Sequence, residues 1–277
     1  MTTTAKTATI DGTVVSRDGT PISFEQTGSG RPVILVASAL ADRRDTKRLA
    51  RLLSAEHTVI NYDRRGRGES GDTPPYDVQR EIDDLAALIE YAGGSASLFG
   101  SSSGAVLALR AAARGLPVDR VVVYEPPFVV GEGTFGPPPG FATRIEEMLD
   151  ADRRGDAVKA FMTEAQGMPR VMVSLMRLVP GMWRTLTSIS HTLPYDIAVM
   201  GDTQQGRHLS AQPWSDATAP TLVLTGCKSP AAFHDAADEL VTVMPDAVHD
   251  RLPGLNHSSV VAAPKKVAPA ISAFLQR

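Results

Sequence analysis

Short apolar runs that alternate with helix-prone segments constrain the fold of this chain most strongly. Pro32–Ala37 is apolar at every position, which is typical of a strand buried on both faces of a parallel sheet, and the helix-prone Asp45–Leu53 follows it. The alternation continues through His57–Tyr62 and the helical spacing of Asp77–Tyr91. Further members are Ser95–Phe99, a helix from Gly104, Val118–Tyr124, Thr221–Thr225, Ala247–Leu252 and Lys266–Leu275. The pattern predicts a doubly wound, mostly parallel α/β sheet.

Two segments depart from this alternation. At the start, Thr7–Val15 and Pro21–Gln26 flank an Asp-Gly pair and predict an antiparallel hairpin. Between Phe128 and Trp214, a Gly/Pro-rich stretch from Gly131 to Gly140 leads into the helix-prone Thr143–Asp150 and Ala157–Ala165. We interpret residues 129–214 as a helical cap inserted into a core formed by residues 1–128 and 215–277. Its many methionines suit an adaptable apolar lid, although we expect most of them to fill the core of the cap.

Composition limits the partners of the chain. With 277 residues and a formal net charge of -3, it gives no sign of a nucleic-acid partner. The single cysteine, Cys227, excludes an internal disulfide, and no Cys/His group has zinc spacing, so we expect neither a metal nor a cofactor. The first ten residues lack a signal-peptide core, and no apolar run is long enough to span a bilayer. We therefore expect a cytoplasmic protein that acts on a small molecule away from membranes, with a homodimer left open.

A candidate nucleophile lies in Gly100-Ser101-Ser102-Ser103-Gly104, directly after a β-prone run and directly before a helix-prone one. A serine exposed at a strand-to-helix corner sits in a strained turn, and flanking glycines remove the side chains that would collide there. Because a serine hydroxyl is a poor nucleophile without a base, Ser102 also needs a histidine and a carboxylate.

His257 is the predicted base. In α/β folds the base lies on a loop at the carboxyl ends of the strands and follows the serine in the chain. His57 precedes Ser102, and the remaining histidines fall in the predicted cap, a helix or a strand. Those are His191, His208, His234 and His249. His257 alone occupies a turn between the last predicted strand and the last helix.

The acid is less direct. The usual place is the loop after Thr221–Thr225, but Gly226-Cys227-Lys228-Ser229-Pro230 offers no carboxylate. Glu125 ends the preceding strand, where Pro126 and Pro127 stop the ladder and direct it to the active edge. We favour Glu125 and keep Asp235, in the following helix, as the alternative.

An oxyanion hole needs two backbone N–H groups aimed at the developing negative oxygen. Ser103 follows the nucleophile and supplies one; the loop Ser38-Ala39-Leu40 is placed to supply the other, from Ala39. The charged, glycine-containing Tyr62–Ser70 fits a tight salt-bridged loop that stiffens the site.

The combination of Tyr62–Ser70, Gly100–Gly104, the inserted cap and the late His257 resembles the α/β-hydrolase superfamily over nearly the whole chain. Two positions depart from its pattern. Ala37-Ser38 stands where the superfamily usually has His-Gly, and Ser229 stands at the usual aspartate position. The resemblance implies an α/β-hydrolase fold with a helical cap and a Ser-acid-His triad.

A narrower likeness is to the fungal zearalenone hydrolases, which open a resorcylic macrolactone. Gly100–Ala105, Glu125-Pro126, Trp183 and Leu252-Pro253-Gly254 are similar to segments of those enzymes. The likeness implies a triad of Ser102, Glu125 and His257, oxyanion donors at Ala39 and Ser103, and a substrate contact at Trp183. We add three neighbouring positions as predicted substrate-binding residues: Phe128, Ser38 and Leu40.

The predicted activity is that of a cofactor-independent serine hydrolase that cleaves an ester, and more specifically a lactone of an apolar small molecule. The same residues also suit a carboxylesterase, a carbon–carbon bond hydrolase, or a biosynthetic cyclase or dehydratase. A non-catalytic small-molecule binder that kept the fold is the alternative of another class.

Overall fold

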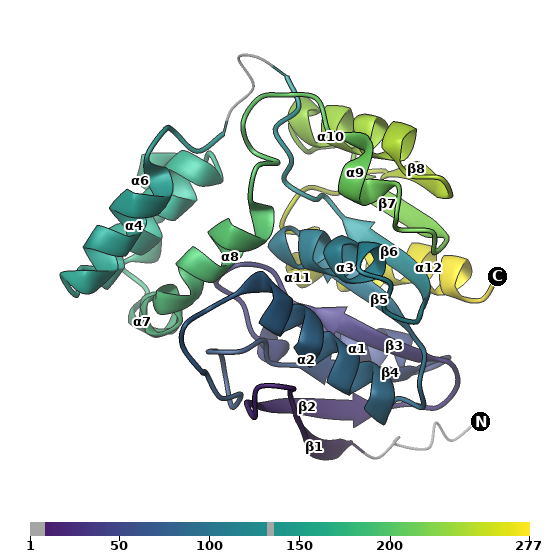
Figure 1. The fold of residues 1–277 in the computed structure, drawn as a ribbon. Coiled ribbons are helices and arrows are strands. Elements are labelled where there is room, and N and C mark those ends of the chain that lie inside the picture. The colour runs from purple at the N-terminus through teal and green to yellow at the C-terminus, as the bar shows by residue number, and fades with distance from the viewer. Residues whose placement is uncertain (1–8, 132–135) are drawn as a thin grey trace, which may run out of the picture.

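In the computed structural model, which describes residues 9–131 and 136–277, the strands form one eight-stranded sheet of order β1-β2-β4-β3-β5-β6-β7-β8. β1 and β2 pair antiparallel with each other, β2 pairs antiparallel with β4, and the remaining neighbours are parallel (Figure 1). The strands are β1 (Ile10–Val15), β2 (Pro21–Thr27), β3 (Pro32–Val36), β4 (Thr58–Tyr62), β5 (Ala96–Ser101), β6 (Val118–Tyr124), β7 (Thr221–Gly226) and β8 (Ala247–Leu252). The predicted architecture is confirmed; residues 7 and 8 of the predicted hairpin lie outside the described residues.

Helices cover both faces of the sheet (Figure 1). The helices of the sheet-forming segments are α1 (Arg43–Leu53), α2 (Val78–Tyr91), α3 (Ser103–Ala113), α10 (Ala231–Val243), α11 (Ser259–Ala262) and α12 (Pro264–Leu275). Along β3, Ile34 and Val36 pack into the core shared with α2, α3 and α10, whereas Val33 and Leu35 pack with α1 and α12. Burial on both faces explains why this strand is continuously apolar.

The parallel strands bring distant loops to one edge of the sheet. Because β3, β5, β6, β7 and β8 run in the same direction, the segments after them lie at their shared carboxyl edge. Those segments begin at Ala37, Ser102, Glu125, Cys227 and Pro253. The predicted catalytic and oxyanion residues all belong to them.

Residues 129–214, which we call the insertion, run between β6 and β7. Their helices are α4 (Phe141–Asp150), α5 (Arg154–Ala160), a π-helical turn (Phe161–Ala165), α6 (Arg170–Met176), α7 (Pro180–Ser188), a 3₁₀ turn (Ser190–Thr192), α8 (Leu193–Met200) and α9 (Ala211–Trp214). Figure 1 shows α4, α6 and α7 to one side of the sheet, with α8 between them and α3. Four residues of the Gly/Pro-rich stretch, 132–135, lie outside the described residues. The division of the chain into core and cap domains stays a prediction.

The insertion has an apolar core of its own. Ile145, Phe161 and Leu193 are buried there together with Leu40 from the loop after β3. Trp214 does not belong to it: its ring lies 5.3 Å from that of Phe128 and is buried in the core beside α3. The end of the insertion therefore packs into the core between the sheet and α3. Across residues 9–131 and 136–277, no helix is both long and apolar enough to cross a membrane.

Candidate active site

Ser102 occupies the corner between β5 and α3. Its backbone has φ 52° and ψ -122°, a strained conformation, and its N–H donates to the Tyr124 carbonyl at 2.9 Å. A Cβ at Gly100 would lie 2.2 Å from the Gly104 carbonyl oxygen, and a Cβ at Gly104 would lie 2.3 Å from that of Val36. The two glycines therefore let the corner close, as the sequence motif predicts.

His257 lies in the turn after β8 and contacts Glu125. Its Nδ1 lies 2.8 Å from Glu125 Oε2, and its ring stacks on Phe233 with 4.6 Å between the ring centroids. The carboxylate is fully buried, whereas the His257 side chain is one-third exposed (33%). The acid favoured from sequence is thus the one that the histidine meets.

Neutral donors hold the other oxygen of Glu125. Oε1 accepts from the Gly226 N–H at 2.7 Å and from the Ser229 hydroxyl at 2.6 Å. Glu125 also has a positive φ of 48°, which turns the chain sharply at the end of β6. Ser229 stands at the usual aspartate position of the sequence pattern. In the structure its hydroxyl helps to hold the carboxylate of Glu125, which follows the neighbouring strand β6.

A pocket of about 140 Å³ opens onto Ser102 and His257. Six of its eight lining residues have polar side chains: Ser38, Ser101, Ser102, Gln166, His257 and Ser258; the other two are Val260 and Val261. Gln166 was not predicted. It follows the π-helical turn, where its N–H donates to the Phe161 carbonyl five residues earlier at 3.1 Å. Single π-turns often occur at functional sites, but the residue pattern gives no sign of one here.

The loop after β3 is fixed by Arg67. One guanidinium nitrogen donates to the carbonyls of Ser38 and Ala41, at 2.7 and 3.1 Å, and the other donates to Asp196 of α8 at 2.7 Å. Leu40 in this loop has a positive φ of 56°. A buried arginine therefore holds the predicted oxyanion loop through two of its backbone carbonyls.

Arg64 lies beside Arg67 and extends the network. It donates to both oxygens of Glu81 and to Asp196 Oδ1, each at 2.7 Å. All four charged side chains are almost completely buried. Burial alone would raise the pKa of the Asp196 carboxyl, but the charges of Arg67 and Arg64 lower it below its usual value. The predicted salt-bridged loop at Tyr62–Ser70 is confirmed, and its link to the insertion is new.

The predicted substrate-binding residues separate in the structure. Ser38 lines the pocket at Ser102. Leu40 packs in the core of the insertion, and Phe128 is buried against Trp214. Trp183 is half-buried, with the Arg177 guanidinium 5.4 Å from its ring centroid. None of these three lines the pocket, and their substrate contacts stay predictions.

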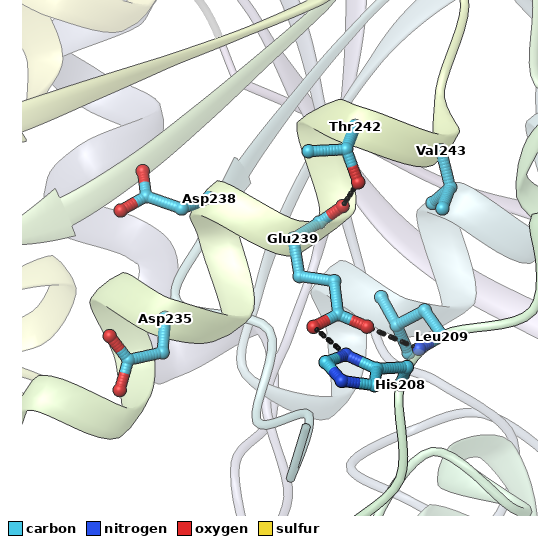
Figure 2. Close-up of a pocket in the computed structure, with 7 residues that line it drawn as sticks. All are labelled: His208, Leu209, Asp235, Asp238, Glu239, Thr242 and Val243. Atoms are coloured by element: carbon cyan, nitrogen blue, oxygen red, sulfur yellow. Dashed lines mark hydrogen bonds and ion pairs between the residues drawn. The ribbon is translucent and has the colours of Figure 1, made fainter. Parts of the chain in front are cut away.

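A second, wider cavity of about 560 Å³ lies against α10. Its lining residues are His208, Leu209, Asp235, Asp238, Glu239, Thr242 and Val243. In Figure 2, Glu239 turns toward His208, while Asp235 and Asp238 project from α10 on the other side. Asp235 is exposed and therefore lies in a setting very different from that of the buried Glu125. The part of the chain that the structure describes holds no group of three or more His, Cys, Asp or Glu side chains arranged for a metal ion.

Comparisons with known proteins agree with this architecture. The model of the "Alpha/beta hydrolase family" matches residues 29–270. The crystal structure of an alpha/beta hydrolase from Sphaerobacter thermophilus is 48% identical, with a TM-score of 0.88, and covers 95% of this chain and 100% of its own. A hydrolase from Pseudomonas aeruginosa, 20% identical with a TM-score of 0.75, covers 96% of this chain and 98% of its own, and shares the fold. Polyketide synthase ThaQ of Burkholderia thailandensis is 28% identical over 268 residues, or 90% of this chain but only 12% of the synthase.

Proposed function

This chain belongs to the alpha/beta hydrolase family, and from that premise we propose that it is a serine hydrolase with Ser102, His257 and Glu125 as its catalytic triad. One observation supports this most directly. His257 lines the same small pocket as Ser102 and bonds through its Nδ1 to the buried Glu125. That arrangement matches the nucleophile, base and orienting acid that acyl transfer requires.

The roles of the three residues follow from this geometry. In the proposed mechanism, the Nδ1–H of His257 donates a hydrogen bond to Glu125, which leaves the lone pair on Nε2, and Nε2 takes the Ser102 proton. Ser102 then attacks the carbonyl carbon, and the N–H groups of Ala39 and Ser103 stabilise the oxyanion. His257 returns its proton to the leaving oxygen, and a water molecule, activated in the same way, hydrolyses the acyl-enzyme.

For the substrate, we propose a carboxylic ester, and more specifically a lactone of an apolar small molecule. A pocket of about 140 Å³ has room for the ester group and a few more atoms, so the rest of a larger molecule would lie outside it, toward the insertion. There α6, α7 and the turn between them offer exposed apolar side chains: Val171, Met172, Leu175, Leu178, Val179 and Met182. We further propose that the reaction needs no cofactor and takes place in the cytoplasm.

Replacement of the nucleophile tests the triad. Ser102→Ala is expected to abolish turnover of p-nitrophenyl esters and labelling by a fluorophosphonate probe, while the melting temperature stays near that of the wild type. Ser258→Ala is the matched control, because Ser258 lines the same pocket but has no proposed chemical role. Labelling of Ser102→Ala at the wild-type rate would overturn the assignment, and an unlabelled wild type would favour the non-catalytic binder.

Product analysis tests the bond. Hydrolysis of a lactone gives one ring-opened hydroxy acid, whereas cleavage of an open ester gives an acid and an alcohol. We expect resorcylic and simple aryl-substituted lactones to be opened with a burst that depends on Ser102. If only linear esters were turned over, the protein would be a carboxylesterase and not a lactonase. Release of fragments from a β-diketone or dienoate would identify a carbon–carbon bond hydrolase.

A further inference from the structure

Asp196 is a fully buried carboxylate of the insertion. It contacts Arg67, which binds the loop that contains Ala39, and it contacts Ser103 itself. Its Oδ2 accepts from Arg67 at 2.7 Å, and its Oδ1 accepts from Arg64 at 2.7 Å and from the Ser103 hydroxyl at 2.8 Å. More than ninety positions of sequence separate Asp196 from any of these partners. The contact therefore exists only because α8 packs against the loops at the active edge.

The contact with Arg67 fixes the direction of the Ala39 N–H. The carbonyl of Ser38 and the N–H of Ala39 belong to one peptide group, and in a trans peptide they point in opposite directions. Since Arg67 binds that carbonyl at 2.7 Å, the Ala39 N–H points away from the guanidinium. Ser38 lines the pocket at Ser102, so this peptide lies at the pocket wall.

The contact with Ser103 fixes the second donor. Ser103 is the first residue of α3, and its side chain is fully buried. With its hydroxyl held by Asp196, the first turn of the helix has a fixed orientation relative to the β3 loop. One carboxylate thus ties together the two backbone segments that must stay in register for a shared oxyanion.

Helix α8 itself is firmly held on the core. The Tyr195 hydroxyl donates to Asp72 at 2.8 Å, the Tyr195 ring stacks on Tyr76 at 3.9 Å, and Arg110 donates to the Val199 carbonyl at 2.6 Å. By contrast, every residue of α7 is at least partly exposed. The segment that bears Asp196 is therefore the part of the insertion best placed to position catalytic groups.

We propose that Asp196 is a positioning residue of the oxyanion hole, which acts through Arg67 on the Ala39 N–H and through its own contact on Ser103. The proposal rests on the proposed serine hydrolase activity. It makes the insertion part of the catalytic machinery, because the oxyanion hole is in register only when α8 is docked.

Asp196→Asn tests the proposal against a matched buried carboxylate. Glu81→Gln also removes a fully buried charge from Arg64, but no hydrogen bond joins Glu81 directly to Arg67 or Ser103. We expect Asp196→Asn to lower kcat by about 10²-fold, the size of effect seen when one oxyanion donor is lost, with KM within about threefold of wild type. Glu81→Gln is expected to lose stability but to keep kcat within about threefold.

A transition-state analogue separates positioning from stability. A boronic acid forms a tetrahedral anion on the serine, so its affinity should weaken for Asp196→Asn by about the same factor as kcat. An unchanged kcat, or an equal loss in Glu81→Gln, would overturn the proposal. If Asp196→Asn does not fold, Arg67→Lys decides: a lysine keeps the charge but cannot bind Asp196 and the Ser38 carbonyl with two nitrogens, and unchanged turnover would then refute the role. Labelling of the wild type but not of Ser102→Ala, measured in parallel, shows whether the serine hydrolase itself stands.

Discussion

Glu125 and Asp196 are two fully buried carboxylates near Ser102, and their hydrogen-bond partners differ in charge. Glu125 accepts from a backbone N–H, a serine hydroxyl and His257. Asp196 lies between two guanidinium groups and a serine hydroxyl. The charge of Asp196 is therefore compensated at all times, whereas that of Glu125 gains a cationic partner only when His257 takes up a proton.

This difference suits each carboxylate to one role. A compensated charge changes little during a reaction and holds its neighbours in place. In the proposed mechanism, an uncompensated carboxylate favours the imidazolium that forms as Ser102 attacks. Such a contact is stronger in the transition state than in the ground state, and this difference is what accelerates a reaction. The comparison predicts that substitutions on the Glu125 side mainly change the rate, and that those on the Asp196 side change both rate and stability.

The largest effect is expected for Glu125→Gln. An amide in place of the carboxylate does not stabilise the imidazolium and can bind the wrong tautomer of His257, so kcat should fall by about 10³- to 10⁴-fold. Asp235→Asn is the matched control, and its exposed carboxylate should be replaceable with less than about a twofold change in kcat. Steady-state kinetics on one activated ester measures both. A large loss in Asp235→Asn alone would transfer the acid role to Asp235 and end the comparison.

The next effect concerns stability. Asp196→Asn leaves two buried guanidinium groups with one carboxylate fewer, and loss of one partner from a buried ionic group costs about 3–5 kcal/mol. Glu125→Gln removes a charge that has neutral partners, so we expect a smaller loss, about 1–3 kcal/mol. Urea unfolding followed by circular dichroism compares the two. Equal losses would mean that charge compensation does not distinguish these carboxylates.

Much of this arrangement was predictable from local sequence. The strands are recognisable because burial on both faces requires continuous apolar runs, and the turn at Ser102 because its close contacts admit only glycine at positions 100 and 104. Glu125 was predictable because two prolines end its strand at the active edge. These features depend on neighbouring residues or on the general geometry of parallel sheets.

The remaining features depend on contacts between distant segments. Asp196 is one acidic residue in a helix, with no local pattern that distinguishes it, and its partners Arg64 and Arg67 lie 132 and 129 positions away. In the sequence, Ser229 indicates only that the usual aspartate is missing. The fold is needed to reveal that Glu125, at the end of β6, accepts a hydrogen bond from it. Trp214 was assigned to the cap by position, yet it packs in the core.

Acid titration sharpens the comparison. Burial alone would raise the pKa values of Asp196 and Glu81, but the arginine charges lower both. A carboxyl whose pKa is lower in the folded state stabilises the fold above its unfolded pKa, about 4, and this stabilisation is lost as the pH falls through the folded pKa. The difference in melting temperature between wild type and Asp196→Asn should therefore shrink from pH 5 toward pH 3. A constant difference would indicate that packing, rather than charge, explains the loss.

The smallest effect is expected for Ser229→Ala. This change removes one neutral hydrogen bond from Glu125 Oε1 and leaves the Gly226 N–H in place, so the carboxylate keeps a donor on each oxygen. Complete loss of a hydrogen bond to a charged group costs about 1.5–3 kcal/mol. A shift of the Glu125 carboxylate toward the Gly226 N–H reduces that cost. We expect kcat to fall by about three- to tenfold with KM unchanged. Ser258→Ala, which alters a serine away from Glu125, is the control. If kcat fell as much as in Glu125→Gln, the single neutral donor Ser229 would be essential to the function of Glu125. Glu125 would then depend on a fixed orientation of its carboxylate as much as the contacts of Asp196 do.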